Sequence, residues 1–232
     1  MKAMKNILAT GAAALFATGA SAGELIQSNA SHSGLYVSVS GGGVFADDSE
    51  FTGPLGQTEF ENDTGYAING AIGYRAPVRI FGFIQPRFEI EGGYIDADID
   101  GSSIDIAGGK TIGDQSAVTL YFNSYAELRF SDDQRLVPYF GGGAGAAFVD
   151  FDAAQVFNGG APNPIASADD TVFAGHLTAG ATYELTDRLE LFSEGRYFRF
   201  SKVDVVFAGP SMLQDDGRID GYTASVGVRW RF

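Results

Sequence analysis

The chain of 232 residues contains no cysteine, two histidines and one tryptophan, and it has 15 basic residues against 29 acidic ones. The absence of cysteine excludes disulfides and thiolate metal sites, so other interactions must hold the fold together. The acidic excess gives a formal net charge of −14, which argues against nucleic acid as a partner. No stretch reaches the ~18 consecutive apolar residues of a membrane-spanning helix, which excludes a helical anchor.

The amino terminus has the pattern of an export signal. Lys2 and Lys5 precede a short apolar run, which ends at the small-x-small tripeptide Ala-Ser-Ala that signal peptidase cleaves. We therefore expect residues 1–22 to be a signal peptide and residues 23–232 to form one exported domain.

Aromatic residues, glycine and a period-two hydrophobic pattern are abundant. The chain holds 19 Phe, 10 Tyr and 32 Gly. In the stretch YTASVGVRWRF, apolar residues at every second position share one face, and small or polar residues share the other. The same alternation predicts eight strands, at residues 34–46, 64–75, 83–95, 117–130, 136–149, 171–185, 188–200 and 219–232.

The links between these strands alternate in length. Short links at 76–82, 131–135 and 186–188 take turns with long links at 47–63, 96–116, 150–170 and 201–218. This pattern is typical of an up-and-down meander that has tight turns at one end and long loops at the other.

The charges of the strands lie on the face opposite the large apolar residues. Strands of roughly ten to fifteen residues can cross a bilayer at a tilt, and aromatic residues near the strand ends resemble interfacial girdles. These aromatics are Tyr74, Phe130, Tyr183, Tyr197, Trp230 and Phe232. Because only a closed barrel pairs every backbone group in hydrocarbon, we expect an all-β fold, an eight-stranded antiparallel up-and-down transmembrane β-barrel with charges inside. The predicted luminal charge network is Arg75, Arg87, Glu89, Glu91, Glu127, Arg129, Glu190, Glu194, Arg196, Arg229 and Arg231.

Four segments carry a resemblance to a known family: RFEIEGGY (87–94), LVPYFGGGAGAAF (136–148), LTAGATYELTDRLELFSEGRYFRF (177–200) and GYTASVGVRWRF (221–232). They resemble the small outer-membrane β-barrel proteins of Gram-negative bacteria, the OmpA-type transmembrane domain and the opacity-like surface proteins. The resemblance implies a location in the cell outer membrane, contact with its lipid and lipopolysaccharide, and insertion by the outer-membrane assembly machinery. It also implies an assembly signal in the last strand, for which Tyr222, Val228, Trp230 and Phe232 are the candidates.

Three functional classes remain open for such a barrel. A structural or surface-interaction role is favoured over a narrow porin, because side chains fill the interior of an eight-stranded barrel. A lipid A-modifying enzyme would need His176 with Thr178 in place of the His-x-Ser pair of barrel deacylases. However, the alternation puts His176 in the lumen, where we expect it to bond a glutamate, so we predict no catalytic residue and no cofactor. The GGGAG run at 141–145 lacks the lysine of a phosphate loop, and we expect its glycines to make room for luminal side chains.

The long links carry six, five, four and three acidic residues, 18 of the chain's 29. One of them contains YIDADIDG, in which Asp96, Asp98 and Asp100 precede Gly101 as in a calcium loop. The twelfth position is Ala107 where that loop needs a bidentate glutamate, so we expect at most a weak divalent-cation site. The links are predicted to be solvated loops, with binding of an extracellular ligand as the alternative.

Overall fold

The computed structural model describes residues 26–28, 32–46, 49–53, 56–62, 64–102, 109–157, 160–161, 163–201, 203–207 and 213–232. The predicted signal peptide lies outside these residues. Within them, no helix has the length and apolar character needed to cross a membrane.

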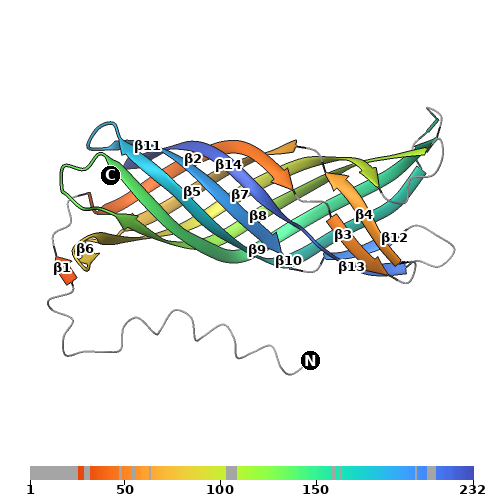
Figure 1. The fold of residues 1–232 in the computed structure, drawn as a ribbon, viewed down its shortest axis with the longest axis horizontal. Helices are drawn as coiled ribbons and strands as arrows, with labels where there is room; N and C mark the ends of the chain where they lie inside the picture. Colours follow the sequence, from red (N-terminus) through yellow and green to blue (C-terminus); the bar gives the residue numbers. More distant parts are fainter. Residues whose placement is uncertain are drawn as a thin grey trace, which may run out of the picture.

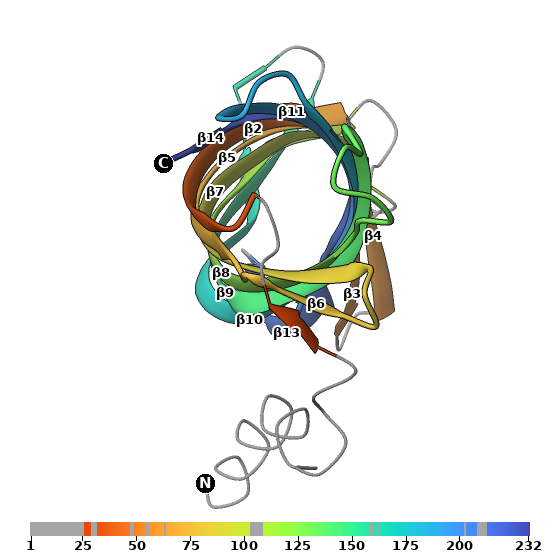
Figure 2. The same ribbon diagram turned by 90° about the vertical axis from the view of Figure 1, so that its left-hand side faces the viewer.

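Eight strands form a closed antiparallel barrel, as the alternation predicts (Figure 1). In order around the barrel they are β2 (Gly34–Ala46), β5 (Thr64–Arg75), β7 (Ile84–Ser102), β8 (Gly109–Leu128), β9 (Leu136–Phe157), β10 (Asn163–Glu184), β11 (Leu189–Phe200) and β14 (Asp220–Arg231). Closure comes from the pairing of the last strand with the first, in which Val226 lies opposite Gly41. Figure 2 looks along the barrel and shows the resulting ring. The fold predicted from the sequence is therefore confirmed.

Short turns join the strands at one end of the barrel, which we name the turn end. Gln134 holds one of these turns closed: its side-chain amide donates to the carbonyls of Leu128 and Leu136 at 2.9 and 2.7 Å, and its Oε1 accepts from the amide of Phe130. At the same end, β1 (Ile26–Ser28) pairs with β6 (Val78–Ile80). Polar side chains thus satisfy backbone groups where the ladder stops.

The long links at the opposite end are not loops where the structure describes them. They contain the hairpins β3 (Ser49–Gly53) with β4 (Gly56–Asn62) and β12 (Val203–Phe207) with β13 (Leu213–Arg218). The two hairpins pair with each other through β13 and β3, and they pair with the barrel through β4 on β7 and β12 on β10. With the extended ends of β7 to β10, they close a second ring of eight strands, which we name the collar (Figure 1).

The collar corrects the prediction of solvated loops, and the cause is strand pairing. β7 and β10 continue well past the points where their barrel neighbours β5 and β11 end. Without the hairpins, both would present long unpaired edges. Several predicted strands end where acidic residues begin, but acidic residues are compatible with an exposed strand face, so these strands continue.

The two faces of each strand differ sharply in exposure. On β8, Val118, Leu120 and Phe122 are 52 to 60 % exposed, whereas the intervening Thr119 and Tyr121 are 2 and 3 % exposed. Large apolar side chains cover the outside in this way on all eight strands. An apolar surface of this extent is suited to lipid and not to water.

Aromatic side chains lie at both ends of this apolar surface. At the turn end, all the predicted girdle members are exposed: Tyr74, Phe130, Tyr183, Trp230 and Phe232. At the collar end, Tyr197 is partly exposed and packs on Tyr222, with ring centroids 5.2 Å apart. Tyr66 and Tyr94 form a second pair there, 6.1 Å apart.

Candidate functional site: the closed lumen

Glu127 is fully buried at the turn-end half of the lumen and lies at the centre of a network of charges. Its Oε2 is 2.7 Å from Arg75 Nε, and its Oε1 is 3.1 Å from Arg87 Nε. A third guanidinium, that of Arg129, lies 3.4 Å from Oε2. One carboxylate therefore faces three arginines brought together by β5, β7 and the end of β8.

Glu190 of β11 is the second centre of the network. It pairs with Arg75 at 3.0 Å, and with Arg229 and Arg231 of β14 at 3.0 and 3.1 Å. Because Arg75 contacts both Glu190 and Glu127, it joins opposite sides of the barrel.

The mouth of the lumen at the turn end is occupied by two residues that the sequence analysis missed. Glu184 accepts from Arg129 at 2.7 Å and lies 3.4 Å from His32 Nδ1, while the carbonyl of His32 accepts from Arg75 Nη1 at 3.0 Å. Burial lowers the pKa of His32 below its ordinary value of 6.5, against an opposing effect of Glu184. The strand alternation could have identified Glu184, whereas His32 precedes the first strand and carries no periodic signal.

A further cluster lies nearer the middle of the lumen. Arg196 donates to both carboxylate oxygens of Glu91 at 2.6 and 2.9 Å and to Glu194 at 3.2 Å. Asn123 donates to Glu91 at 3.0 Å, and the hydroxyl of Tyr139 donates to Glu194 at 2.7 Å. These neutral groups satisfy carboxylate lone pairs that the arginine leaves free.

Arg87 connects the charges to luminal aromatic rings. Its guanidinium contacts Glu89 and lies over the rings of Tyr125 and Tyr139, 4.2 and 4.6 Å from their centroids. Glu89 also accepts a 2.5 Å hydrogen bond from the hydroxyl of Tyr36. Such cation–π contacts stabilise a buried guanidinium.

The structure places all eleven residues of the predicted network inside the barrel, and Glu184 is a twelfth member. The network then has six arginines and six glutamates, so its formal charge is zero. A buried charge without a partner would cost several kcal/mol, and the pairing offsets part of that cost.

The half of the lumen nearer the collar is apolar, so the charges predicted inside the barrel occupy only the turn-end half and the middle of the lumen. The inward side chains there pack into one hydrophobic cluster, which includes Val44, Val149, Phe151, Val172, Phe198, Phe200 and Ile219. Phe151 and Phe200 are each 1 % exposed. In this part of the barrel the strands carry apolar residues on both faces. An alternation of polar and apolar residues therefore could not predict the apolar cluster inside the barrel.

Little space remains between the charged side chains. A cavity between Ser38, Asn69, Arg87, Glu89 and Arg229 has a volume of about 10 Å³, enough for one water molecule. Gly143 contributes to this filling, because a Cβ there would overlap Asn123 Oδ1 and lie 2.6 Å from His176 Nε2. Gly143 therefore makes room for luminal side chains, as predicted, whereas a Cβ at Gly142 or Gly145 would meet the backbone of a neighbouring strand.

The comparisons with known proteins agree with this architecture. The sequence matches the family model described as the outer membrane protein beta-barrel domain over residues 10–232. The chain belongs to this family. No curated protein sequence matches it.

One solved structure with a similar fold is that of an outer membrane protein. The outer membrane protein OprG from Pseudomonas aeruginosa is 14 % identical, and the match covers 88 % of this chain and 99 % of OprG with a TM-score of 0.59. Neisserial surface protein A is 17 % identical over 85 % of this chain and 97 % of its own, with a TM-score of 0.46. The outer membrane protease OmpT from Escherichia coli is 10 % identical over 89 % and 99 %, with a TM-score of 0.47. The match to the family model, together with the closed ladder, establishes the chain as an outer-membrane β-barrel, and the family resemblance seen in the sequence is confirmed.

His176 of this outer-membrane barrel lies in the lumen, 5 % exposed. Its ring nitrogens are 3.0 Å from Asn123 Oδ1 and from Thr178 Oγ1, and its ring packs edge-on against Tyr121. The predicted bond to a glutamate is therefore wrong, since Asn123 stands between His176 and Glu91. The histidine has no face toward the lipid.

The candidates for the assembly signal and the cation site are placed as follows. Tyr222, Val228, Trp230 and Phe232 all point outward from the last strand and its end, with exposures of 42 to 77 %. Asp96 accepts a 2.8 Å hydrogen bond from the hydroxyl of Tyr94, and the side chains of Asp98 and Asp100 lie outside the described part. Among the residues that the structure describes, no group of three or more His, Asp or Glu is arranged to hold a metal ion.

Proposed function

We propose that this outer-membrane barrel is a sealed scaffold that carries the collar as an interaction surface outside the cell, and that it is neither a porin nor an enzyme. The observation that carries the proposal is the filled lumen. Ion pairs cross its turn-end half and an apolar cluster fills its collar-end half. An ion would have to displace both layers to pass.

The collar supports the interactive part of the proposal. Strands hold the long links in a ring instead of leaving them as loops, so the barrel projects a preorganised surface beyond the membrane. Family barrels place their longer connections outside the cell. Export through a cleaved signal peptide and insertion by the outer-membrane assembly machinery belong to the same proposal.

Recording from the purified chain in planar bilayers tests the seal. We expect no stable openings from the wild-type chain. The variant Phe151→Ala/Phe198→Ala keeps every luminal ion pair but removes two rings from the apolar cluster, and it shows whether the charged layer seals alone. Stable openings of nanosiemens size from the wild-type chain would contradict the proposal.

Lipid analysis tests the absence of catalysis. Cells that express the wild-type chain or the His176→Ala variant are compared with cells that lack the chain. We expect the same lipid A species in all three, because His176 has no access to lipid. A modified species that needs both the chain and His176 would establish an enzyme.

Replacement of both hairpins by short turns tests the collar. We expect the shortened chain to fold, as judged by heat-modifiable migration on a gel, because the barrel keeps its own closed ladder. Since the two replaced links hold nine of the 29 acidic residues, six at 47–63 and three at 201–218, cells with the full chain should adhere better to a polylysine-coated surface than cells with the shortened chain. Equal adhesion would contradict an interactive collar.

A further inference from the structure

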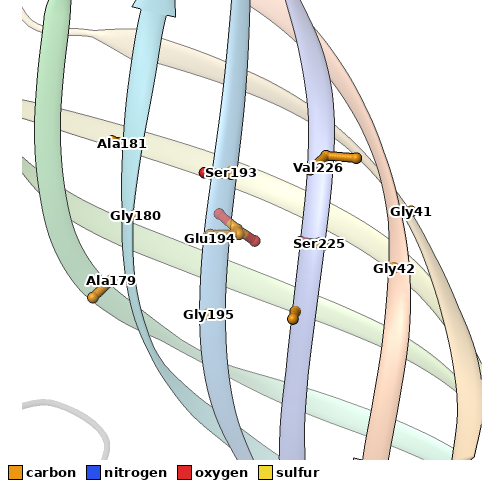
Figure 3. A pocket seen from close by; sticks show the side chains of 11 residues that line it. Gly41, Gly42, Ala179, Gly180, Ala181, Ser193, Glu194, Gly195, Ser225 and Val226 are labelled. Atoms are coloured by element: carbon orange, nitrogen blue, oxygen red, sulfur yellow. The ribbon is translucent and has the colours of Figure 1, made fainter.

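The lipid-facing surface has a hollow across β10, β11, β14 and β2. Figure 3 shows why: at this level of the barrel most of the outward positions on four neighbouring strands carry small residues, in contrast to the larger side chains above and below. The hollow has a volume of about 570 Å³ and is lined by Gly41, Ala179, Ala181, Ser193, Gly195 and Ala224. It continues toward the turn end into a second hollow of about 810 Å³, because both are lined by Gly41, Ala181, Ser193 and Val226.

Bulky side chains bound this groove. Leu136, Tyr183 and Leu191 line its turn-end part, and Leu177 and Tyr222 stand exposed on the strands that form its other part. A hollow of this kind cannot stay empty in hydrocarbon without losing dispersion contacts, and its apolar lining gives water few partners. An acyl chain has the shape and polarity to fill it.

Arg199 lies just beyond the collar end of this groove, past the Tyr197 and Tyr222 pair, and its guanidinium is 5.9 Å from the centroid of the Tyr197 ring. It lies on the same strand and face as Gly195, four residues or ~13 Å nearer the collar. Its side chain is 52 % exposed, and one of its N–H groups faces Asp220 at 3.4 Å, which leaves further donors free for an anion. Among the side chains that the structure describes at the collar end, Arg199 is the exposed cation, whereas the exposed aspartates there are Asp114, Asp150, Asp152 and Asp169.

We propose that Arg199 and the groove together bind one molecule of lipid A in the outer leaflet. The phosphate of the lipid pairs with the guanidinium, and one acyl chain lies along Gly195 and Ala224. Arginine suits phosphate because its planar fork donates two parallel hydrogen bonds. The collar end faces the outer leaflet, since the longer connections of such barrels are extracellular. This inference goes beyond the proposed function, because it involves neither the lumen nor the collar.

Native mass spectrometry of the purified chain in detergent tests the site, with diphosphoryl lipid A as the titrant. We expect one tightly bound lipid A on the wild-type chain. Arg199→Gln should weaken binding about fivefold, as expected for one cation at a membrane surface. Gly195→Leu should weaken it at least as much by filling the groove, and a Cβ at Gly195 meets no atom within 4 Å, so the barrel accommodates the change.

Two matched variants serve as controls. Gly92→Leu adds the same side chain on β7, on the opposite side of the barrel, and Arg135→Gln removes an exposed arginine at the turn end. Both should bind lipid A as the wild-type chain does. Folding of every variant is checked by heat-modifiable migration, and Ala224→Leu fills the same groove if Gly195→Leu does not fold.

Three results would overturn the inference. The first is unchanged lipid A binding by both Arg199→Gln and the groove-filling variant. The second is equal binding of phosphatidylglycerol, which would make the contact a general one with anionic lipid. The third is a wild-type dimer that Gly195→Leu dissociates, which would show that a second copy of the chain occupies the groove.

Discussion

Neutralising Glu127 is the sharpest perturbation of the luminal network. The variant Glu127→Gln keeps the size of the side chain but removes the negative charge that faces Arg75, Arg87 and Arg129. Removing one partner of a buried ion pair costs about 3–5 kcal/mol of unfolding free energy. Each of the three arginines keeps another glutamate, so we expect the lower end of this range, about 3 kcal/mol.

The assay is urea unfolding of the barrel in lipid vesicles, followed by the fluorescence of Trp230, the one tryptophan of the chain. Asp132→Asn is the matched control, since it neutralises the 72 % exposed partner of Arg79 at the turn end. Exposed pairs contribute about 0–1 kcal/mol, so the control should change little. The double variant Glu127→Gln/Arg75→Gln should lose less stability than the sum of its parts, because it removes one charge of each sign. If Glu127→Gln costs no more than Asp132→Asn, the network does not stabilise the barrel.

Three further predictions concern other parts of the chain. Because burial lowers the pKa of His32, its docked form is the neutral one. Docking is therefore favourable above pH 6.5 and weakens as the pH drops toward about 5. The free energy of unfolding of the wild-type chain should fall more over that range than that of His32→Gln, and equal pH profiles would contradict the docking of a neutral His32. Gly143→Ala should cost about 1–3 kcal/mol of unfolding free energy, because its Cβ would overlap luminal side chains. Gly195→Ala, whose Cβ lies in open space, should be nearly neutral. Equal costs for the two variants would contradict the luminal packing. Phe232→Ser should lower the yield of the protein in the outer membrane of cells but should not change refolding in vitro. Phe130→Ser changes another exposed aromatic residue at the turn end and should leave the yield unchanged. Equal yields of the two variants would contradict the role of Phe232 in the assembly signal.

Much of the barrel could be predicted because lipid and lumen impose opposite chemistry on alternate residues. The strands at 34–46 and 64–75 have the predicted bounds, and β11 and β14 begin within about one residue of theirs. In contrast, β8 and β10 begin about eight residues earlier than predicted, and β7 and β9 end about seven or eight residues later. The collar could not be predicted in the same way. Its strands carry acidic residues, and their pairing with distant strands depends on edges that exist only once the barrel has closed.

The sequence pattern likewise predicts only part of the candidate site. Periodicity puts a residue such as Glu127 in the lumen, but it does not give its partners, which come from three different strands. His176 illustrates the limit: its face was predicted correctly and its partner was not, because Asn123 lies on a strand 53 residues away in sequence. His32 lies before the first strand, so no periodic pattern marks it as a luminal residue.

The central claim is that lipid contacts the apolar face of the strands while the charged face is sealed inside. Because the chain has no cysteine, a single nitroxide can be attached at residue 120 or residue 119 through an introduced cysteine. Leu120 is 53 % exposed and Thr119 is 2 % exposed. In vesicles, the label at 120 should collide often with lipid-soluble oxygen and rarely with a water-soluble nickel complex, and the label at 119 should collide rarely with both. Frequent collision of the label at 120 with the nickel complex would show that water contacts the apolar face. Frequent collision of the label at 119 with the nickel complex would show an open, water-filled lumen. Either result would contradict the account.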